Sequence, residues 1–175
     1  MTSNDWSQYW SSAEWAAAQS SPRGRLEAEL IEEVRGNQTA VHQMDEAACR
    51  SMGINATDGR CLDVIDRRGQ ISAGELATAA GLTTGAVTAV LDRLEEKDYV
   101  RRLPDPNDRR RILVEVTERH REAAARLYFP LKAMADPFFE DLSDKDVELL
   151  IAFNRVSREV NEKRAAQIRA ELEAE

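Results

Sequence analysis

The chain has 175 residues, of which 42% are apolar and 32% are charged, and its formal net charge is -8. This length suits one domain that buries roughly 70% of its unfolded surface. An acidic average argues against a nucleic-acid partner, because phosphate binding normally needs basic residues. However, residues 60–121 contain 12 basic and 11 acidic residues, whereas the rest of the chain contains 12 basic and 21 acidic ones. The acidic surplus therefore lies outside a nearly neutral middle segment.

Cysteine content and hydropathy exclude two further classes of protein. Cys49 and Cys61 are too few for a scaffold built on disulfides. The sequence contains no run of about 18 apolar residues, and its start lacks the basic and apolar regions of a signal peptide. We therefore expect a cytoplasmic protein with no membrane partner.

Residues 1–21 form a Trp-rich extension that holds four of the chain's aromatic residues, Trp6, Tyr9, Trp10 and Trp15. Trp6 and Trp10 would share one helix face at a spacing of four. The segment is expected either to form a short helix docked on the body of a dimer or to stay partly disordered. The sequence itself favours neither, and we predict the first, in which the extension packs on the dimer body and its removal lowers stability.

Residues 22–56 are predicted to contain an N-terminal dimerisation helix, from about Arg25 to Met52. Its apolar residues recur at helical spacing, at Leu26, Leu30, Val34, Val41, Met44 and Ala48. Such a helix would be roughly 40 Å long, which is more than one small core would cover. It is therefore predicted to contact a second subunit.

Residues 57–121 are predicted to form a compact helical unit that ends in a hairpin. Thr57 is predicted to cap a helix that continues to Arg68 and ends at Gly69. A short extended segment over residues 70–72 follows. Ser72 and Glu75 then have the spacing of a capping box and predict the start of the next helix.

Two helices joined by a tight turn follow from the segment SAGELATAAGLTTGAVTAVLDRLEEKDYV. Ala77 is small where the helices would cross, Gly81 can adopt a left-handed turn, and Val87 would pack the second helix on the first. Their spacings of four and six residues are those of a helix-turn-helix. Thr83 is predicted to cap the second helix.

Two strands are predicted at residues 99–103 and 112–116, joined by a long loop. The segment from Arg101 to Arg111 contains five arginines and two aspartates. Placed beside the second helix, this hairpin makes a winged helix whose wing can reach a minor groove or phosphates. The basic segment therefore raises the expectation of DNA binding above what the helix-turn-helix spacing alone supports.

Residues 122–175 are predicted to be C-terminal dimerisation helices. Thr117 is expected to cap the first of them, which is kinked or interrupted at Pro130 and Pro137. The last helix is expected to start at Leu142 and Ser143. The fold class is thus mainly α with a small β-hairpin wing: a winged helix-turn-helix domain between long N- and C-terminal dimerisation helices.

The chain resembles the MarR family of bacterial winged-helix regulators. The resemblance spans residues 25–172 and is carried by Leu91-Asp92-Arg93-Leu94-Glu95, by the wing Asp105-Pro106-Asn107-Asp108-Arg109-Arg110, and by Val114 with Val116-Thr117. Two departures stand out: Asp98 occupies a position where glycine is usual, and His120 one where glycine is frequent. Aspartate tolerates the left-handed conformation, so the first departure should cost little.

The predicted DNA-binding residues lie on two elements. The first turns of the second helix are small and uncharged, which would let their N–H and hydroxyl groups reach phosphates and base edges, at Thr83, Thr84, Gly85, Ala86 and Thr88. Cationic contacts are expected from Arg93, Arg109, Arg110 and Arg111, with Asp108 supporting the wing through an ion pair. The resemblance favours Arg110 as the minor-groove residue. For Arg93 the alternative is a structural bridge to Glu96 or Asp92.

A symmetric homodimer would place two second helices roughly 34 to 36 Å apart on a palindromic operator in double-stranded DNA. The resemblance implies a transcriptional regulator, a repressor in our prediction, that responds to a small-molecule effector, aromatic or phenolic, or to an oxidant. No enzyme is expected, because phosphate-binding loops, nucleophile elbows and catalytic metal motifs are missing from the sequence. No cofactor is expected either.

Three alternatives remain open. Cys49 and Cys61 could make a thiol-based redox sensor, although two buried structural thiols are favoured. His42, Asp45 and Glu46 could share a helix face and bind a metal, although a solvated face is favoured. The winged helix could also be a protein-interaction module without DNA binding, in which case binding to DNA would not depend steeply on salt.

Overall fold

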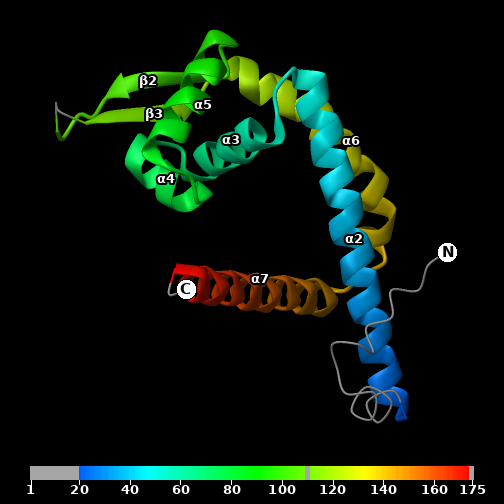
Figure 1. Ribbon diagram of the computed structural model, residues 1–175. Helices are drawn as coiled ribbons and strands as arrows, with labels where there is room; N and C mark the ends of the chain where they lie inside the picture. The colour runs from blue at the N-terminus through cyan, green and yellow to red at the C-terminus, as the bar shows by residue number, and fades with distance from the viewer. Residues whose placement is uncertain (1–19, 109–110, 174–175) are drawn as a thin grey trace. The chain divides into compact units, whose positions relative to one another are not determined.

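The computed structural model describes residues 20–108 and 111–173 (Figure 1). The Trp-rich extension therefore lies almost entirely outside the described residues, as do Arg109 and Arg110. The chain divides into two compact units, and the division falls between Arg121 and Glu122. The first unit contains helices α2 to α5 with a small sheet, and the second contains most of α6 and all of α7.

Helix α2 (Pro22–Met52) opens the first unit and starts three residues before the predicted Arg25. Ser21 caps it by accepting a hydrogen bond from the Gly24 N–H, and Pro22 occupies a first-turn position where its missing N–H costs nothing. Gly53 ends it in the left-handed conformation. Of the predicted apolar stripe only Ala48 is buried, and Leu26, Leu30 and Val41 stay exposed in this chain.

Helix α3 (Ala56–Arg68) shows that the predicted Thr57 cap is wrong. The cap is Asn55, whose side chain accepts from the Asp58 N–H at 2.9 Å, so the helix starts earlier. Both residue types cap helices, and here asparagine supplies the stronger capping side chain. The predicted end at Gly69 is confirmed.

Helices α4 (Ala73–Ala80) and α5 (Thr84–Glu96) form the predicted helix-turn-helix. The capping box is present, and Gly81 adopts the left-handed conformation with φ 65°. Thr83 caps α5 by accepting from the Ala86 N–H. Ala77 and Val87 are buried, as the crossing of two helices requires.

The sheet has three strands in the order β1-β3-β2, formed by β1 (Ile71–Ser72), β2 (Val100–Pro104) and β3 (Ile112–Val116). All pairs are antiparallel, and Val114 is the register partner of both Ile71 and Arg102. Pairing of the short extended segment with the hairpin was not predicted. Figure 1 shows the β2–β3 hairpin extending beyond α4 and α5.

The core of the first unit joins α3, α4 and α5 to the sheet. Its large side chains that are almost fully buried are Leu62, Ile65, Leu76, Val87, Val90, Leu91, Leu94, Val100, Val114 and Val116. They come from α3, α4, α5, β2 and β3, so the packing fixes the position of α5 relative to the hairpin. This placement matters for the site described below.

In the second unit, α6 (Glu118–Glu140) continues through both prolines. Of the predicted kink or interruption, the interruption is therefore wrong, and the kink stays a prediction. Helix α7 (Asp144–Glu173) follows a short turn, and the predicted start is confirmed because Ser143 accepts from the Asp146 N–H. Large apolar residues on both helices stay exposed in this chain, among them Phe129, Met134, Phe138, Leu149, Val156 and Val160. None of the described helices combines the length and apolar composition that a membrane span requires.

Candidate nucleic-acid interface

The N-terminal half of α5 is an exposed surface without charge. Thr83, Thr84, Gly85, Ala86 and Thr88 are all exposed, and no charged side chain occurs over residues 83–91. Thr88 donates its hydroxyl hydrogen to the Thr84 carbonyl at 3.1 Å. The structure thus brings together the five small residues that the sequence predicts as contacts. A helix N-terminus with small side chains can approach phosphates and base edges closely.

The C-terminal half of α5 is attached to α3 through a buried carboxylate. Arg93 donates two hydrogen bonds to Asp58, from Nη2 at 2.6 Å and from Nε at 3.3 Å. The Asp58 side chain is only 3% exposed, whereas Arg93 is 45% exposed. The predicted alternative for Arg93 was a structural bridge to Glu96 or Asp92, and the bridge that forms is to Asp58 instead. Its role as a DNA contact stays a prediction.

A second attachment links α5 to the sheet. Arg102 of β2 pairs with Asp92 at 2.6 Å and also with Glu95. Both carboxylates lie on α5, so one guanidinium of the wing strand bridges two acidic residues in the C-terminal half of this helix. The two attachments hold the helix on two sides while its N-terminal half remains exposed.

The base of the wing is closed by main-chain and side-chain contacts. The Asp105 N–H donates to the Arg111 carbonyl at 3.0 Å, and the Arg111 N–H donates to the Asp108 carbonyl at 2.9 Å. Asp105 is buried, and its carboxylate accepts from the Asn107 N–H at 2.8 Å. Arg111 pairs with Asp105 at 3.8 Å and with Glu75 of α4 at 3.0 Å. Of the predicted wing contacts, the structure therefore locates Arg111 and not Arg109 or Arg110.

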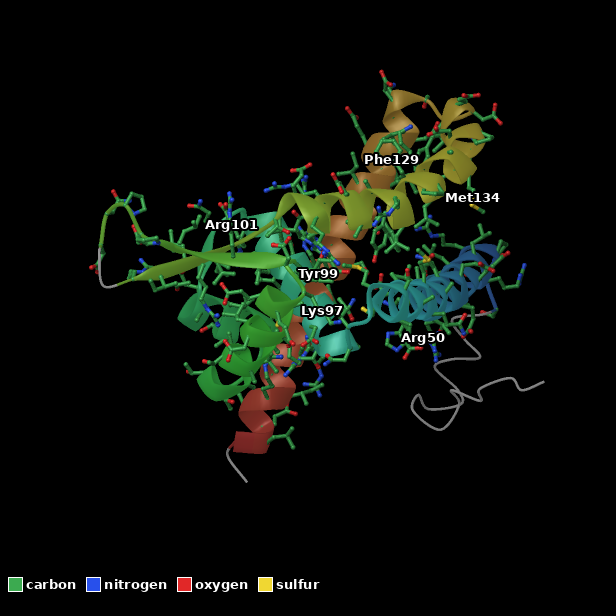
Figure 2. The ribbon with its side chains drawn as sticks, turned by 90° about the horizontal axis from the view of Figure 1, so that it is seen from above. Arg50, Lys97, Tyr99, Arg101, Phe129 and Met134 are labelled. Carbon is green, nitrogen blue, oxygen red and sulfur yellow. The ribbon has the colours of Figure 1, made fainter. Side chains whose placement is uncertain are left out.

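Three polar side chains, Gln70, Arg101 and Glu115, contact one another where the wing strands join the rest of the first unit. Arg101 pairs with its register partner Glu115 at 2.5 Å, and Gln70 donates to the same carboxylate at 2.7 Å. The hydrogen bond from Gln70, followed by the contact with Arg101, lowers the pKa of Glu115. Figure 2 shows Arg101 on the wing strand β2. This arginine was not among the predicted contacts, and its guanidinium is engaged within the sheet.

Tyr99 joins three elements at the root of the wing. Its hydroxyl donates to the Met52 carbonyl at the end of α2, at 3.2 Å. Its ring lies edge-on to His120 at 6.1 Å, and the Arg119 guanidinium lies 5.8 Å from the ring centre. Tyr99, labelled in Figure 2, follows Asp98 in the chain. Asp98 adopts φ 58°, the left-handed conformation expected where the resembled family usually has glycine.

Sequence reasoning missed several residues that shape this site: Asp58, Glu75 as a wing partner, Arg102, Asp105 and Tyr99. Asp58 carried a local signal as an acidic residue in a first turn, but nothing in the pattern indicated a partner 35 positions away. Arg102 was counted only as one of the five arginines of the basic segment, and no partner was predicted for it. Their partners depend on tertiary packing, which periodicity does not describe.

The geometry gives little support to a redox sensor at Cys49 and Cys61 or to a metal site at His42, Asp45 and Glu46. Both cysteines are free thiols, and burial is the main cause that raises the pKa of each, which disfavours the reactive thiolate. Cys49 Sγ packs against Gly59, where a Cβ would collide with it. His42 pairs with Glu46 at 3.5 Å on an exposed face. Over the described residues, no group of three or more His, Cys, Asp or Glu side chains is placed to hold a metal ion.

Comparisons with known proteins agree with this architecture. The model of the MarR family matches residues 54–112. An uncharacterized HTH-type transcriptional regulator of Bacillus subtilis, YcgE, is 33% identical over 131 residues, which are 75% of this chain and 85% of that protein.

Two solved structures share the fold. FabT of Streptococcus pneumoniae in complex with DNA aligns with a TM-score of 0.59 and 19% identity, over 77% of this chain and 97% of that one. The multiple antibiotic-resistance repressor MarR of Listeria monocytogenes aligns with a TM-score of 0.55 and 22% identity, over 82% and 99%. With the family model and the YcgE match, the chain belongs to the MarR family: it is a DNA-binding winged-helix transcriptional regulator and not an enzyme.

Proposed function

We propose that this regulator acts as a homodimeric repressor on a palindromic operator and that a small-molecule effector modulates its binding. The observation that carries the proposal is the exposed, uncharged N-terminal half of α5 beside a wing rich in arginine. The protein core fixes these two elements relative to each other, so they can enter adjacent grooves without rearranging. A cytoplasmic location, as the sequence predicts, agrees with this role.

The division of contacts follows from the chemistry of each element. Thr83, Thr84, Gly85, Ala86 and Thr88 would reach base edges and phosphates in the major groove. Arg109 and Arg110 would supply the wing contacts, with Arg110 in the minor groove and Asp108 supporting them. Arg93 is a weaker candidate, because Asp58 already accepts two of its hydrogen bonds.

Apolar residues that this chain leaves exposed support the proposed dimer. Large exposed side chains recur on α2, α6 and α7, for example Leu26, Phe129, Met134, Leu149 and Val160. Exposed apolar residues at this density favour contact with another protein surface. A second copy is the occupant we propose, because two-fold symmetry would also present two α5 helices to a palindrome.

Repression and effector control rest on the family. A relative of the same fold is named a multiple antibiotic-resistance repressor. We propose an aromatic or phenolic effector for this chain. It would control DNA binding only if it favours one separation of the two α5 helices over the other.

Selection of bound genomic fragments, followed by a salt titration on the recovered site, tests the proposal. A palindrome should be recovered, and the affinity should fall steeply with salt because each neutralised phosphate contributes a slope of about -0.9. Arg110→Ala should reduce that slope by about one such unit, whereas Arg67→Ala on α3 serves as a control for lost charge. A flat salt response would instead favour the protein-interaction module.

A further inference from the structure

The guanidinium of Arg111, the predicted wing contact that the structure describes, is bound from two sides within the chain. Nη2 donates to Glu75 Oε2 at 3.0 Å, and Nε lies 3.8 Å from Asp105 Oδ2. Glu75 is on α4, the first helix of the helix-turn-helix, and Asp105 is at the opposite side of the wing loop. We call Ser72, Glu75, Asp105 and Arg111 the wing-base cluster.

Glu75 is held in place independently of Arg111. Its Oε2 accepts from the Ser72 N–H at 3.0 Å and from the Ser72 hydroxyl at 2.6 Å, which completes the capping box of α4. These hydrogen bonds from Ser72, followed by the contact with Arg111, lower the pKa of Glu75 to about 2. The carboxylate is therefore charged and already oriented, so Arg111 meets a fixed partner. A preorganised partner reduces the entropy cost that weakens most exposed ion pairs.

The wing-base cluster lies next to the place where β1 pairs with the wing strand β3. Ser72 is the register partner of Leu113 on β3. Arg111 directly precedes β3 and lies two residues from Leu113, on the side of the wing loop. The ion pair between Arg111 and Glu75 thus joins the same two chain segments just beyond the β1–β3 pairing. It couples the wing loop to the helix that directly precedes the turn into α5.

We propose that Arg111 is a positioning residue that, through Glu75 and Asp105, fixes the base of the wing against the N-terminus of α4, and that it is not one of the cationic DNA contacts. The helix-turn-helix and the wing must enter adjacent grooves together, so the angle of the wing affects binding by both. The DNA part of this inference rests on the proposed binding mode of α5 and the wing.

Affinity measurements with single and double variants separate positioning from contact. Glu75→Gln keeps a side chain that can serve in a capping box but removes the charge that Arg111 meets. Glu75→Gln and Arg111→Ala should each lower DNA affinity by about two- to fivefold, the range of an exposed ion pair. The double variant should be no weaker than either single one, and the salt slope should stay that of the wild type. Asp63→Asn is the matched control, because it removes one charge from the exposed Asp63–Arg67 pair on α3.

A direct phosphate contact by Arg111 predicts the opposite pattern. Arg111→Ala would then reduce the salt slope by about 0.9. Glu75→Gln would leave the affinity unchanged or raise it, because it removes a negative charge beside the contact. Either result would overturn the proposal.

Amide hydrogen exchange in the free protein decides the matter without DNA. The N–H groups of Asp105 and Arg111 close the wing base, so Glu75→Gln should make both exchange several-fold faster, while Asp63→Asn should leave them unchanged. Unchanged exchange in Glu75→Gln would overturn the positioning role. If the wild-type protein selects no DNA, the proposed function fails, and the exchange rates still test the wing-base cluster.

Discussion

The winged-helix segment and the long helices α6 and α7 differ in how far their large apolar side chains are buried within this chain. Between α3 and β3, large side chains such as Leu62, Leu94 and Val114 are 2% exposed or less. On α6 and α7, Phe129, Met134 and Leu149 are 72%, 79% and 68% exposed in this chain. The apolar residues of the first segment are covered by its own elements, whereas those of α6 and α7 stay exposed in this chain. Under our proposal the α5–wing geometry is therefore set within one chain, and a second copy would cover the apolar residues of the long helices.

The largest expected effect concerns the self-sufficient core. Leu94→Ala removes a fully buried side chain from α5 and should lower the free energy of unfolding by about 2–5 kcal/mol. Because this core is contained in one chain, the loss should be the same at high and low protein concentration. Chemical denaturation at two concentrations measures it. A loss that disappears at high concentration would show that the core is shared between chains.

The next effect concerns the exposed helices. Met134→Glu should weaken self-association by about 1.5–3 kcal/mol for each Met134 side chain that the dimer would bury, because it replaces an apolar side chain at the proposed dimer surface by a charge. Sedimentation equilibrium measures the dissociation constant. Arg126→Glu, on the same helix but at a polar position, should change it little. Equal effects of the two variants would argue against an apolar dimer surface on α6.

A smaller effect is expected at the attachment between α5 and α3. Asp58→Asn removes the charge that Arg93 meets and should cost about 1–2 kcal/mol, less than a fully buried pair because Arg93 is half exposed. Thermal or chemical denaturation measures the loss, with the exposed Asp63→Asn as control. Should both variants have the same stability, the Asp58–Arg93 bridge would contribute nothing to the position of α5.

The smallest effect is the pH dependence from His120. This side chain is buried beside Tyr99, its Nδ1 has no hydrogen-bond partner among the described residues, and burial lowers its pKa below the usual 6.5. The neutral form is thus favoured in the folded state. The contribution of His120 to the free energy of unfolding is therefore fully present above pH 6.5, and it is lost as the pH decreases from there toward the folded-state pKa.

His120→Gln should remove this decrease, and His42→Gln on the exposed face of α2 should not. Denaturation at pH 7.5 and pH 5.5 compares the three proteins. A wild-type protein as stable at pH 5.5 as at pH 7.5 would contradict the buried neutral histidine.

Local signals were sufficient for most elements of the first unit. The Ser72–Glu75 capping box and the turn at Gly81 are predicted from neighbouring residues, and both are confirmed. The left-handed conformation of Asp98 is expected from the glycine that the resembled family usually has there, and it is confirmed as well. The Thr57 cap was wrong because two polar residues, Asn55 and Thr57, are separated by only one position, and asparagine caps the helix start. The continuity of α6 was not predicted, because each proline was taken by itself as a helix breaker. The helical residues on both sides of Pro130 and Pro137 continue the helix through them.

In the candidate site, the exposure of the small residues of α5 could be predicted from the sequence. The apolar spacing assigns one face of the helix to the core, so the remaining positions face outward; the buried residues are Val87, Val90, Leu91 and Leu94. Partners of the arginines were not predictable. Arg93 meets Asp58, and Arg111 meets Glu75, across 35 and 36 positions of sequence. Only the three-dimensional packing selects one carboxylate among many.

Gly85 offers the most direct test that the N-terminal half of α5 contacts DNA. Gly85 and Gly74 are both exposed second residues of their helices, and a Cβ added at either would meet nothing within 4 Å. Leucine at either position should therefore leave the fold intact. Gly85→Leu should lower the affinity for the selected operator by about tenfold or more, because the added side chain would clash in the groove, at a cost of about 1–3 kcal/mol. Gly74→Leu should stay within about twofold of the wild type. Equal binding by Gly85→Leu and the wild-type protein would contradict the account.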